Sequence, residues 1–179
     1  MSAGATTFKN SDDLRIDAVR LMDRIMSLAD ISPIAGGGNC RLALTDDDKD
    51  GRDLVVSWMR DLNMDVSIDA VGNIIAIWNV GTGAPVMTGS HIDTVRTGGK
   101  FDGNYGVLAG IEVIETVIES GAETERPLAV AFFTDEEGAR FAPDMLGSLV
   151  YVGGLPLEVA LDTIAIDGAV LGEDLERIG

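Results

Sequence analysis

Apolar residues recur at helical spacing in three long stretches of the chain. Between Asp13 and Ala29 they fall three or four residues apart, the period of a helix that buries one face, and Ser11 or Asp12 is available as its cap. A second helix is predicted to begin after Thr45, and a third to end at Gly121. The positions expected to be buried are Leu14, Ala18, Leu21, Met22, Ile25, Leu28 and Ala29 in the first helix, Leu54, Val55, Trp58, Met59 and Leu62 in the second, and Val107, Leu108, Ile111, Ile114 and Ile118 in the third.

Shorter apolar runs predict strands. Residues 66–70 alternate between apolar and polar, residues 74–78 are almost wholly apolar, and a turn around Gly72 joins the two runs. Residues 85–89 and 128–133 are predicted as two further strands on either side of the third helix. A strand, helix, strand unit is typical of parallel pairing, so we expect an α/β fold with a mixed, mostly parallel sheet covered by helices. Short helices are predicted to follow at 145–152, 157–161 and 172–178.

Residues 32–39 contain Pro33 and three consecutive glycines, so they are predicted to form a loop. A phosphate-binding loop is the alternative for such glycines. No Lys-Ser or Lys-Thr pair follows them, and they do not open a helix after a strand. We therefore expect an ordinary connecting loop.

Composition narrows the class of protein. The 179 residues include 13 Lys and Arg against 30 Asp and Glu, and the net charge of −17 disfavours nucleic acid and anionic membranes as partners. The single cysteine, Cys40, excludes an intramolecular disulfide and a cysteine-based zinc cluster, and it favours a reducing compartment. The first ten residues lack the apolar stretch of a secretory signal, and no apolar run is long enough to span a membrane. We therefore expect a cytoplasmic protein with no nucleic-acid or membrane partner.

Three polar clusters surround the third helix and its flanking strands. His91, the only histidine, and Asp93 follow the strand before this helix. Asp102 lies at the entrance of the helix, and Glu136 and Glu137 follow the next strand. Ligands bind at the carboxyl ends of strands in open α/β sheets, so these side chains are expected to converge. A lone histidine is more often a buried structural residue, but one imidazole placed together with several carboxylates is the ligand chemistry of a divalent metal such as zinc.

Residues 46–51 match the first half of an EF-hand calcium loop, with acids at positions one, three and five and glycine at position six. The second half does not match, because position twelve is Ser57 instead of a bidentate glutamate and position eight is Asp53 instead of an apolar residue. We interpret the acids as the first turn of the second helix, where the helix dipole favours negative charge.

The segments TGSHIDTVRTGGKFDGNYGVLAGIEV and FFTDEEGARF carry a family resemblance. Together they resemble the zinc-dependent aminoacylase and carboxypeptidase superfamily, and within it the branch of N-carbamoyl-L-amino-acid hydrolases, allantoate amidohydrolases and β-ureidopropionases. The similarity runs from about the first helix to the last residue. It implies a metal-dependent amidohydrolase that cleaves linear amide or ureido C–N bonds in an N-carbamoyl or ureido small molecule.

Carried over residue by residue, the resemblance implies a site with two divalent metal ions, zinc or else manganese, cobalt or nickel. His91 would bind one metal, Asp102 would bridge both, and Glu137 would bind the second. Glu136 would act as the general base. Asp93 would accept a hydrogen bond from the other nitrogen of His91 and fix its tautomer.

The chain departs from the family in length and in the number of ligands. Members are more than twice as long, and they take two further histidine ligands, substrate contacts and a dimerisation domain from parts without a counterpart here. We therefore interpret residues 1–179 as the N-terminal part of a zinc-peptidase-like catalytic domain, without the dimerisation domain and the C-terminal catalytic half. The complete enzyme is expected to be a homodimer. Arg140 also matches the family motif, but the sequence assigns it no role.

Two consequences follow from such an incomplete domain. It would expose a sheet edge and an apolar face, so we expect self-association. The alternative to a catalytic function is a structural or regulatory fragment that binds no metal tightly.

Overall fold

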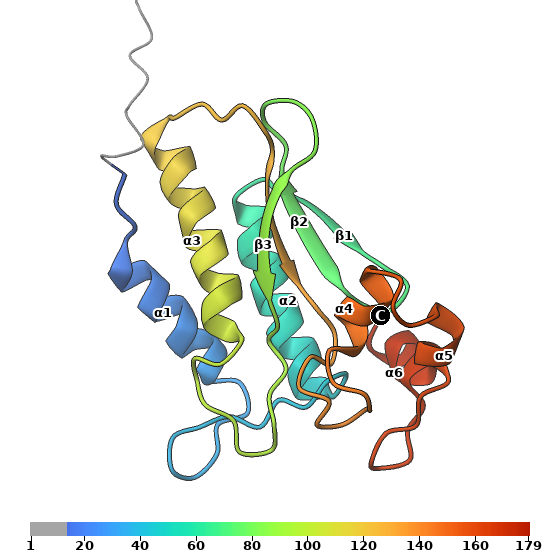
Figure 1. The fold of residues 1–179 in the computed structure, drawn as a ribbon. Coiled ribbons are helices and arrows are strands. Elements are labelled where there is room, and N and C mark those ends of the chain that lie inside the picture. The colour runs from blue at the N-terminus through green and yellow to red at the C-terminus, as the bar shows by residue number, and fades with distance from the viewer. Residues whose placement is uncertain (1–13) are drawn as a thin grey trace, which may run out of the picture.

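The computed structural model describes residues 14–179 (Figure 1). Ser11 and Asp12, the expected caps of the first helix, lie outside these residues. The described elements are α1 (Ala18–Ala29), α2 (Asp46–Asp61), β1 (Asp65–Ile68), β2 (Ile74–Trp78), β3 (Val86–Ser90), α3 (Asn104–Ser120), β4 (Leu128–Phe132), α4 (Leu146–Tyr151), α5 (Leu157–Leu161) and α6 (Leu171–Ile178).

Capping interactions set the ends of the three long helices. Helix α1 begins later than expected because the carboxylate of Asp17 accepts hydrogen bonds from the amides of Val19 and Arg20, at 2.9 and 3.0 Å. Thr45 caps α2 as expected, and its hydroxyl accepts from the amide of Asp48. Gly121 ends α3 with a left-handed φ of 67°.

The sheet is mixed, in the order β1-β2-β4-β3. Its mixed character confirms the expected class, but the expectation of mostly parallel pairing is wrong for the described strands. Strands β1 and β2 form an antiparallel hairpin, and β2 also pairs antiparallel with β4, so only β3 and β4 are parallel. The reason is topological: a short turn at Gly72 reverses the chain, whereas the crossover through α3 returns it in the same direction.

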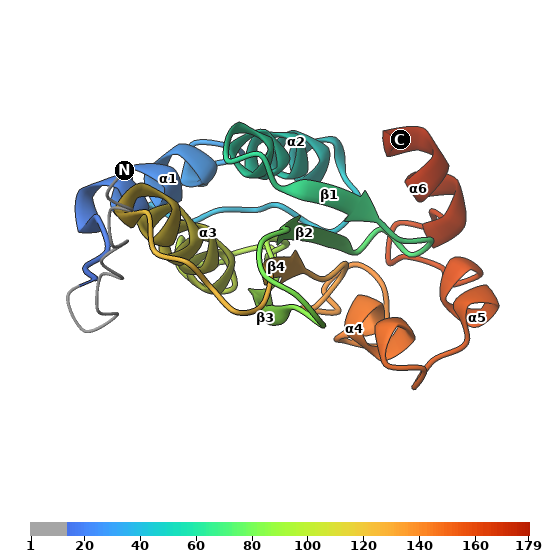
Figure 2. The ribbon, with the colours of Figure 1, turned by 90° about the horizontal axis from the view of Figure 1, so that it is seen from above.

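One hydrophobic core joins α1, α2 and α3 to the strands β2 and β4. The buried stripes of the helices largely agree with the sequence pattern, and Ile25, Leu28 and Met59 are fully buried. Met22 was expected inside but is 41% exposed, because α1 turns the line of Leu21, Ile25 and Leu28 toward the core. A second, smaller core lies under α4, α5 and α6, which gather at the end of the sheet away from α1 and α3 (Figure 2).

Strand β3 forms one edge of the sheet and is largely exposed. Val86 is 51% and Met87 is 40% exposed, and both line an apolar groove between β3 and α3. The expected exposed edge is therefore present among the described residues. None of the helices in residues 14–179 is long and apolar enough to cross a membrane.

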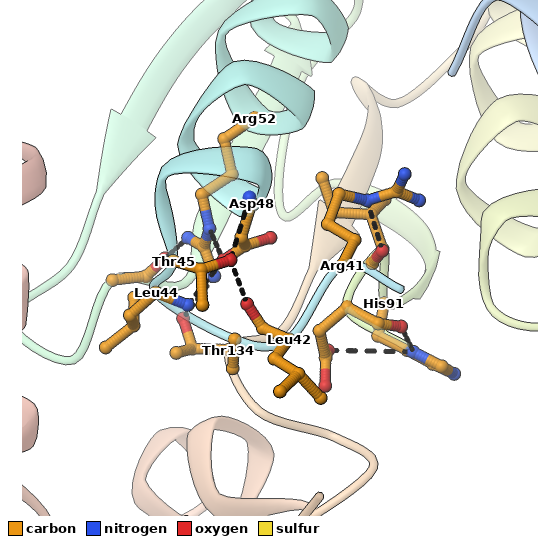
Figure 3. Close-up of polar contacts among 12 residues, drawn as sticks. Arg41, Leu42, Leu44, Thr45, Asp48, Arg52, His91 and Thr134 are labelled. Carbon is orange, nitrogen blue, oxygen red and sulfur yellow. Dashed lines mark hydrogen bonds and ion pairs between the residues drawn. The ribbon is translucent and has the colours of Figure 1, made fainter. Parts of the chain in front are cut away.

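The acids at the start of α2 form its first turn, as we interpreted them, and one of them also forms an ion pair that the sequence analysis did not predict. Asp48 is fully buried, and its Oδ2 accepts from the amide of Leu44 at 2.8 Å and from Nε of Arg52 at 2.7 Å (Figure 3). Arg52 continues this network by donating to the carbonyl of Gly72 and the hydroxyl of Thr134. Asp48, the central acid of the EF-hand half-match, is thus paired with Arg52.

Candidate functional site

The site lies where β3 and β4 end. Their parallel register pairs Ser90 with Phe132, so the segments that follow the two strands leave the sheet side by side. The amide of Phe133 continues this pairing by donating to the carbonyl of Ser90 at 2.9 Å. The clusters that follow β3 and β4 therefore start as neighbours, as the sequence predicted.

Gly103 brings the start of α3 against the imidazole of His91. His91 is 5% exposed, and a Cβ built on Gly103 would lie 2.5 Å from its ring. Gly103 also has a φ of 63°, which side chains rarely adopt. Only glycine allows this approach, and it places the exposed Asp102 at the same end of the sheet as His91.

Asp93 ties the segments after β3 and β4 together. It is 2% exposed, and its two carboxylate oxygens accept hydrogen bonds from the amides of Glu136 and Glu137, at 3.2 and 3.3 Å. Its relation to His91 differs from the expected one. His91 Nδ1 lies 3.0 Å from the main-chain oxygen of Asp93 and 3.6 Å from its carboxylate, so the carbonyl is the nearer acceptor.

Electrostatics couple His91 to the acids around it. Nε2 of His91 lies 3.2 Å from Oε2 of Glu136, whose side chain is 35% exposed. Burial of the imidazole lowers the pKa of His91, but the hydrogen bonds and charge of Asp93 and the charge of Glu136 outweigh it and raise this pKa to about 9. The imidazolium is therefore the favoured form at neutral pH.

Several acidic side chains surround Glu137. Its pKa is raised by burial and by the charges of Asp102, Asp93 and Glu136, while His91 opposes the rise. These couplings connect Glu137 with each of the other four predicted site residues. Carboxylates gathered in this way are stabilised by a bound cation.

The candidate donor side chains are of the types that bind zinc, but they are too few to complete a zinc site. It offers one imidazole and several carboxylates, which are ligands that zinc accepts, yet a catalytic zinc site takes three protein ligands. Within residues 14–179, no group of three or more His, Cys, Asp or Glu side chains is arranged to hold a metal ion. The described residues thus offer side chains of a suitable kind near one another but do not form a complete metal site.

Three further buried residues, to which the sequence assigned no role, lie near the candidate site. Asp135 is fully buried, and burial together with the charge of Asp93 raises its pKa to about 8. Arg140, left without a role by the sequence, is a structural tie that donates to the carbonyl of Ala43 and pairs with Asp174. Arg41 is fully buried, and an arginine in a glycine-rich loop region gives no sequence signal of burial.

Comparison with known proteins places this site in a family. The model of peptidase family M20/M25/M40 matches residues 87–175, which include every predicted site residue. Over 171 residues the chain is 43% identical to an N-carbamoyl-L-amino-acid amidohydrolase of Rhizobium meliloti, covering 94% of this chain and 41% of the relative. It is 38% identical to a ureidoglycolate hydrolase of Arabidopsis thaliana, covering 88% of this chain and 34% of the relative.

A solved structure agrees with these relatives. The crystal structure of a hydantoinase/carbamoylase family amidase from Burkholderia ambifaria superimposes with a TM-score of 0.90 at 50% identity, covering 93% of this chain and 42% of that chain. The chain thus spans about two fifths of the length of the proteins it matches. The motif-bearing segment, the relatives and the fold therefore agree: residues 87–175 match peptidase family M20/M25/M40, and the chain is similar to part of an N-carbamoyl-L-amino-acid amidohydrolase and of a hydantoinase/carbamoylase family amidase.

Proposed function

We propose that this chain supplies one half of the active site of a metal-dependent amidohydrolase that cleaves linear C–N bonds. The observation that carries the proposal is the convergence of His91, Asp93 and the acidic pair Glu136 and Glu137 at the ends of β3 and β4. The relatives named above are hydrolases of carbamoyl and ureido compounds. An N-carbamoyl amino acid or a related ureido acid is the proposed substrate class.

Each residue has a distinct role in this proposal. His91, Asp102 and Glu137 would hold divalent metal, whose chemistry when bound is to polarise the carbonyl and lower the pKa of water. Glu136 would take a proton from the attacking water and give it to the leaving nitrogen. Its side chain suits this work because it is 35% exposed, so water can reach it. Asp93 would position Glu136 and Glu137 through their amides.

Metal binding by the chain is the first test. We expect the wild-type chain to bind Zn²⁺ in a chelator-competition titration, and His91→Ala or Glu137→Gln to weaken binding at least tenfold. Glu123→Gln is the matched control, because Glu123 is an exposed acid outside the site. Equal Zn²⁺ affinity in all four proteins would contradict the proposed ligands.

Hydrolysis is tested by joining residues 1–179 to the remaining part of the Rhizobium meliloti relative. The chimera is expected to release product from an N-carbamoyl-L-amino acid. Glu136→Gln in the chimera should lower kcat by about 10²–10⁴, the usual contribution of a general base, while Glu123→Gln leaves it unchanged. A chimera that folds but stays active with Glu136→Gln would exclude this residue as the base.

The incomplete ligand group favours one alternative function. A structural or regulatory fragment would keep the fold of this end of the sheet without binding metal tightly, and the described residues form no complete metal group. It predicts that His91→Ala does not change the Zn²⁺ content. The metal titration above therefore separates the two functions.

A further inference from the structure

A buried arginine lies beneath the candidate site. Arg41 is fully buried, although it belongs to the irregular segment between α1 and α2. Within residues 14–179 its guanidinium donates to neutral acceptors and forms no ion pair: the carbonyls of Leu28, Ile31 and Ile92 and the side-chain oxygen of Asn104. Burial lowers the pKa of Arg41, which reflects the cost of desolvating its charge. Because burying this charge costs free energy, we expect the guanidinium to perform a role in the fold.

Two of the four acceptors of Arg41 lie in the segments that carry His91 and Asp102. Nε donates at 2.9 Å to the carbonyl of Ile92, which lies between His91 and Asp93 in the sequence. Nη2 donates at 2.9 Å to Oδ1 of Asn104, the first residue of α3. Asn104 directly follows Gly103, which packs on the imidazole. The guanidinium thus bridges the segment after β3 and the turn that starts α3.

Two further observations show that this placement is built into the fold. The main chain of Arg41 exchanges hydrogen bonds with Thr94, from its amide to the Thr94 hydroxyl and from the Thr94 amide to its carbonyl, both at 2.8 Å. Helix α2 has glycine at position 51, and a Cβ there would lie 2.8 Å from Cδ of Arg41. Gly51 therefore leaves the space that the buried side chain occupies.

We propose that Arg41 is a positioning residue that holds the His91–Asp93 segment against the Asp102–Asn104 turn and so sets the spacing of the donor groups. Its importance for catalysis rests on the proposed function, whereas its role in holding the two segments together does not. The planar guanidinium donates in several directions at once, which the single ammonium of lysine cannot reproduce. Arg41 acts through its neighbours and does not touch the reacting atoms.

The test uses the only histidine of the chain, whose ring signals are unique in an NMR spectrum. In the wild-type chain we expect a nuclear Overhauser effect between the His91 ring protons and the α protons of Gly103. Arg41→Met and Arg41→Lys should each lose most of this signal while remaining folded. Arg24→Met is the control, because Arg24 pairs with Glu115 far from the site and its loss should leave the signal intact.

A folded Arg41→Met variant with an unchanged signal would overturn the proposal. If that variant does not fold, Asn104→Ala removes one acceptor and keeps the arginine, and it should weaken the same signal at least twofold; an unchanged signal there also overturns the proposal. Zn²⁺ affinity gives a second readout, expected to fall about tenfold in Arg41→Lys and to stay constant in Arg24→Met. A wild-type chain without Zn²⁺ binding would contradict the proposed function, while the His91–Gly103 signal would still decide the role of Arg41.

Discussion

Nε2 of His91 and Oε2 of Glu136 lie 3.2 Å apart, which joins the proposed metal ligand to the proposed base across the ends of two neighbouring strands. The pair comes together because β3 and β4 are parallel and in register at Ser90 and Phe132. Asp93 reinforces it through the amide of Glu136. The contact therefore follows from the topology of the strand, helix, strand unit.

The first prediction concerns the pH dependence of stability. The pKa of His91 rises from its ordinary value of 6.5 to about 9 in the folded chain, so the charged imidazole stabilises the fold. This contribution is fully present below about pH 6.5 and is lost as the pH rises through 9. A shift of this size corresponds to at most about 3–4 kcal/mol.

Urea unfolding between pH 6 and pH 10 measures the loss, and an NMR titration of the single histidine measures the pKa itself. Glu136→Gln removes one of the charges that raise the pKa, so it should lower the pKa of His91, whereas Glu123→Gln should not. A histidine that titrates near 6.5 in the folded wild-type chain would refute the predicted coupling.

The second prediction compares two glycines of the same loop. Gly103→Ala should destabilise the fold by more than about 2 kcal/mol, because the new Cβ meets the His91 ring and the backbone is left-handed. Gly99→Ala is the control, since nothing lies within 4 Å of the Cβ position there. Denaturant unfolding of both variants tests the difference, and equal costs would show that the His91 ring moves aside freely.

The hydrophobic pattern predicted all the elements that position the site. The strands before and after α3, the stop at Gly121 and the cap at Thr45 all follow from local rules of periodicity and capping. The mostly parallel sheet was wrong because the direction of β2 against β4 depends on long-range pairing that no local pattern encodes. The start of α1 was misplaced because several acids compete as caps, and Asp17 succeeds through its own side chain.

The sequence predicted that the candidate residues gather at one edge of the sheet, but not the atomic contacts among them. The motifs brought His91 and the acids to one edge, because strand ends place them there. They did not show that Asp93 holds two amides, since a hydrogen bond to a main-chain group leaves no side-chain partner to find in the sequence. Arg41 was missed for the same reason, because most of its acceptors are carbonyls.

The third prediction concerns the ion pairs between α1 and α3. The side chain of Glu112 is fully buried and pairs with Arg20 at 2.7 Å and with Arg24 at 3.6 Å. Glu112→Gln should cost about 1.5–3 kcal/mol, because it removes the charge from a buried acceptor of the Arg20 side chain and the Asp17 amide, while Arg20 and Arg24 keep Glu115 as a partner. Glu119→Gln is the matched control: Glu119 also pairs with Arg20, but its side chain is 58% exposed, so we expect a loss of under about 1 kcal/mol. Similar losses in the two variants, measured by urea unfolding, would contradict a central role for Glu112.

The last prediction concerns the open edge at β3. Val86 and Met87 expose apolar surface beside unpaired strand groups, so the isolated chain should self-associate through this edge. The net charge of −17 opposes association, and added salt screens this repulsion, so the associated fraction should rise with ionic strength.

Light scattering over a range of salt concentrations tests this expectation. Met87→Lys should lower the associated fraction, because a charge on an edge strand hinders pairing. Val152→Lys adds the same charge at a residue that is 73% exposed and lies outside the sheet, so it should have the weaker effect. A chain that stays monomeric at all salt concentrations would show that the β3 edge is not an association surface, and equal effects of the two lysines would show that net charge alone controls association.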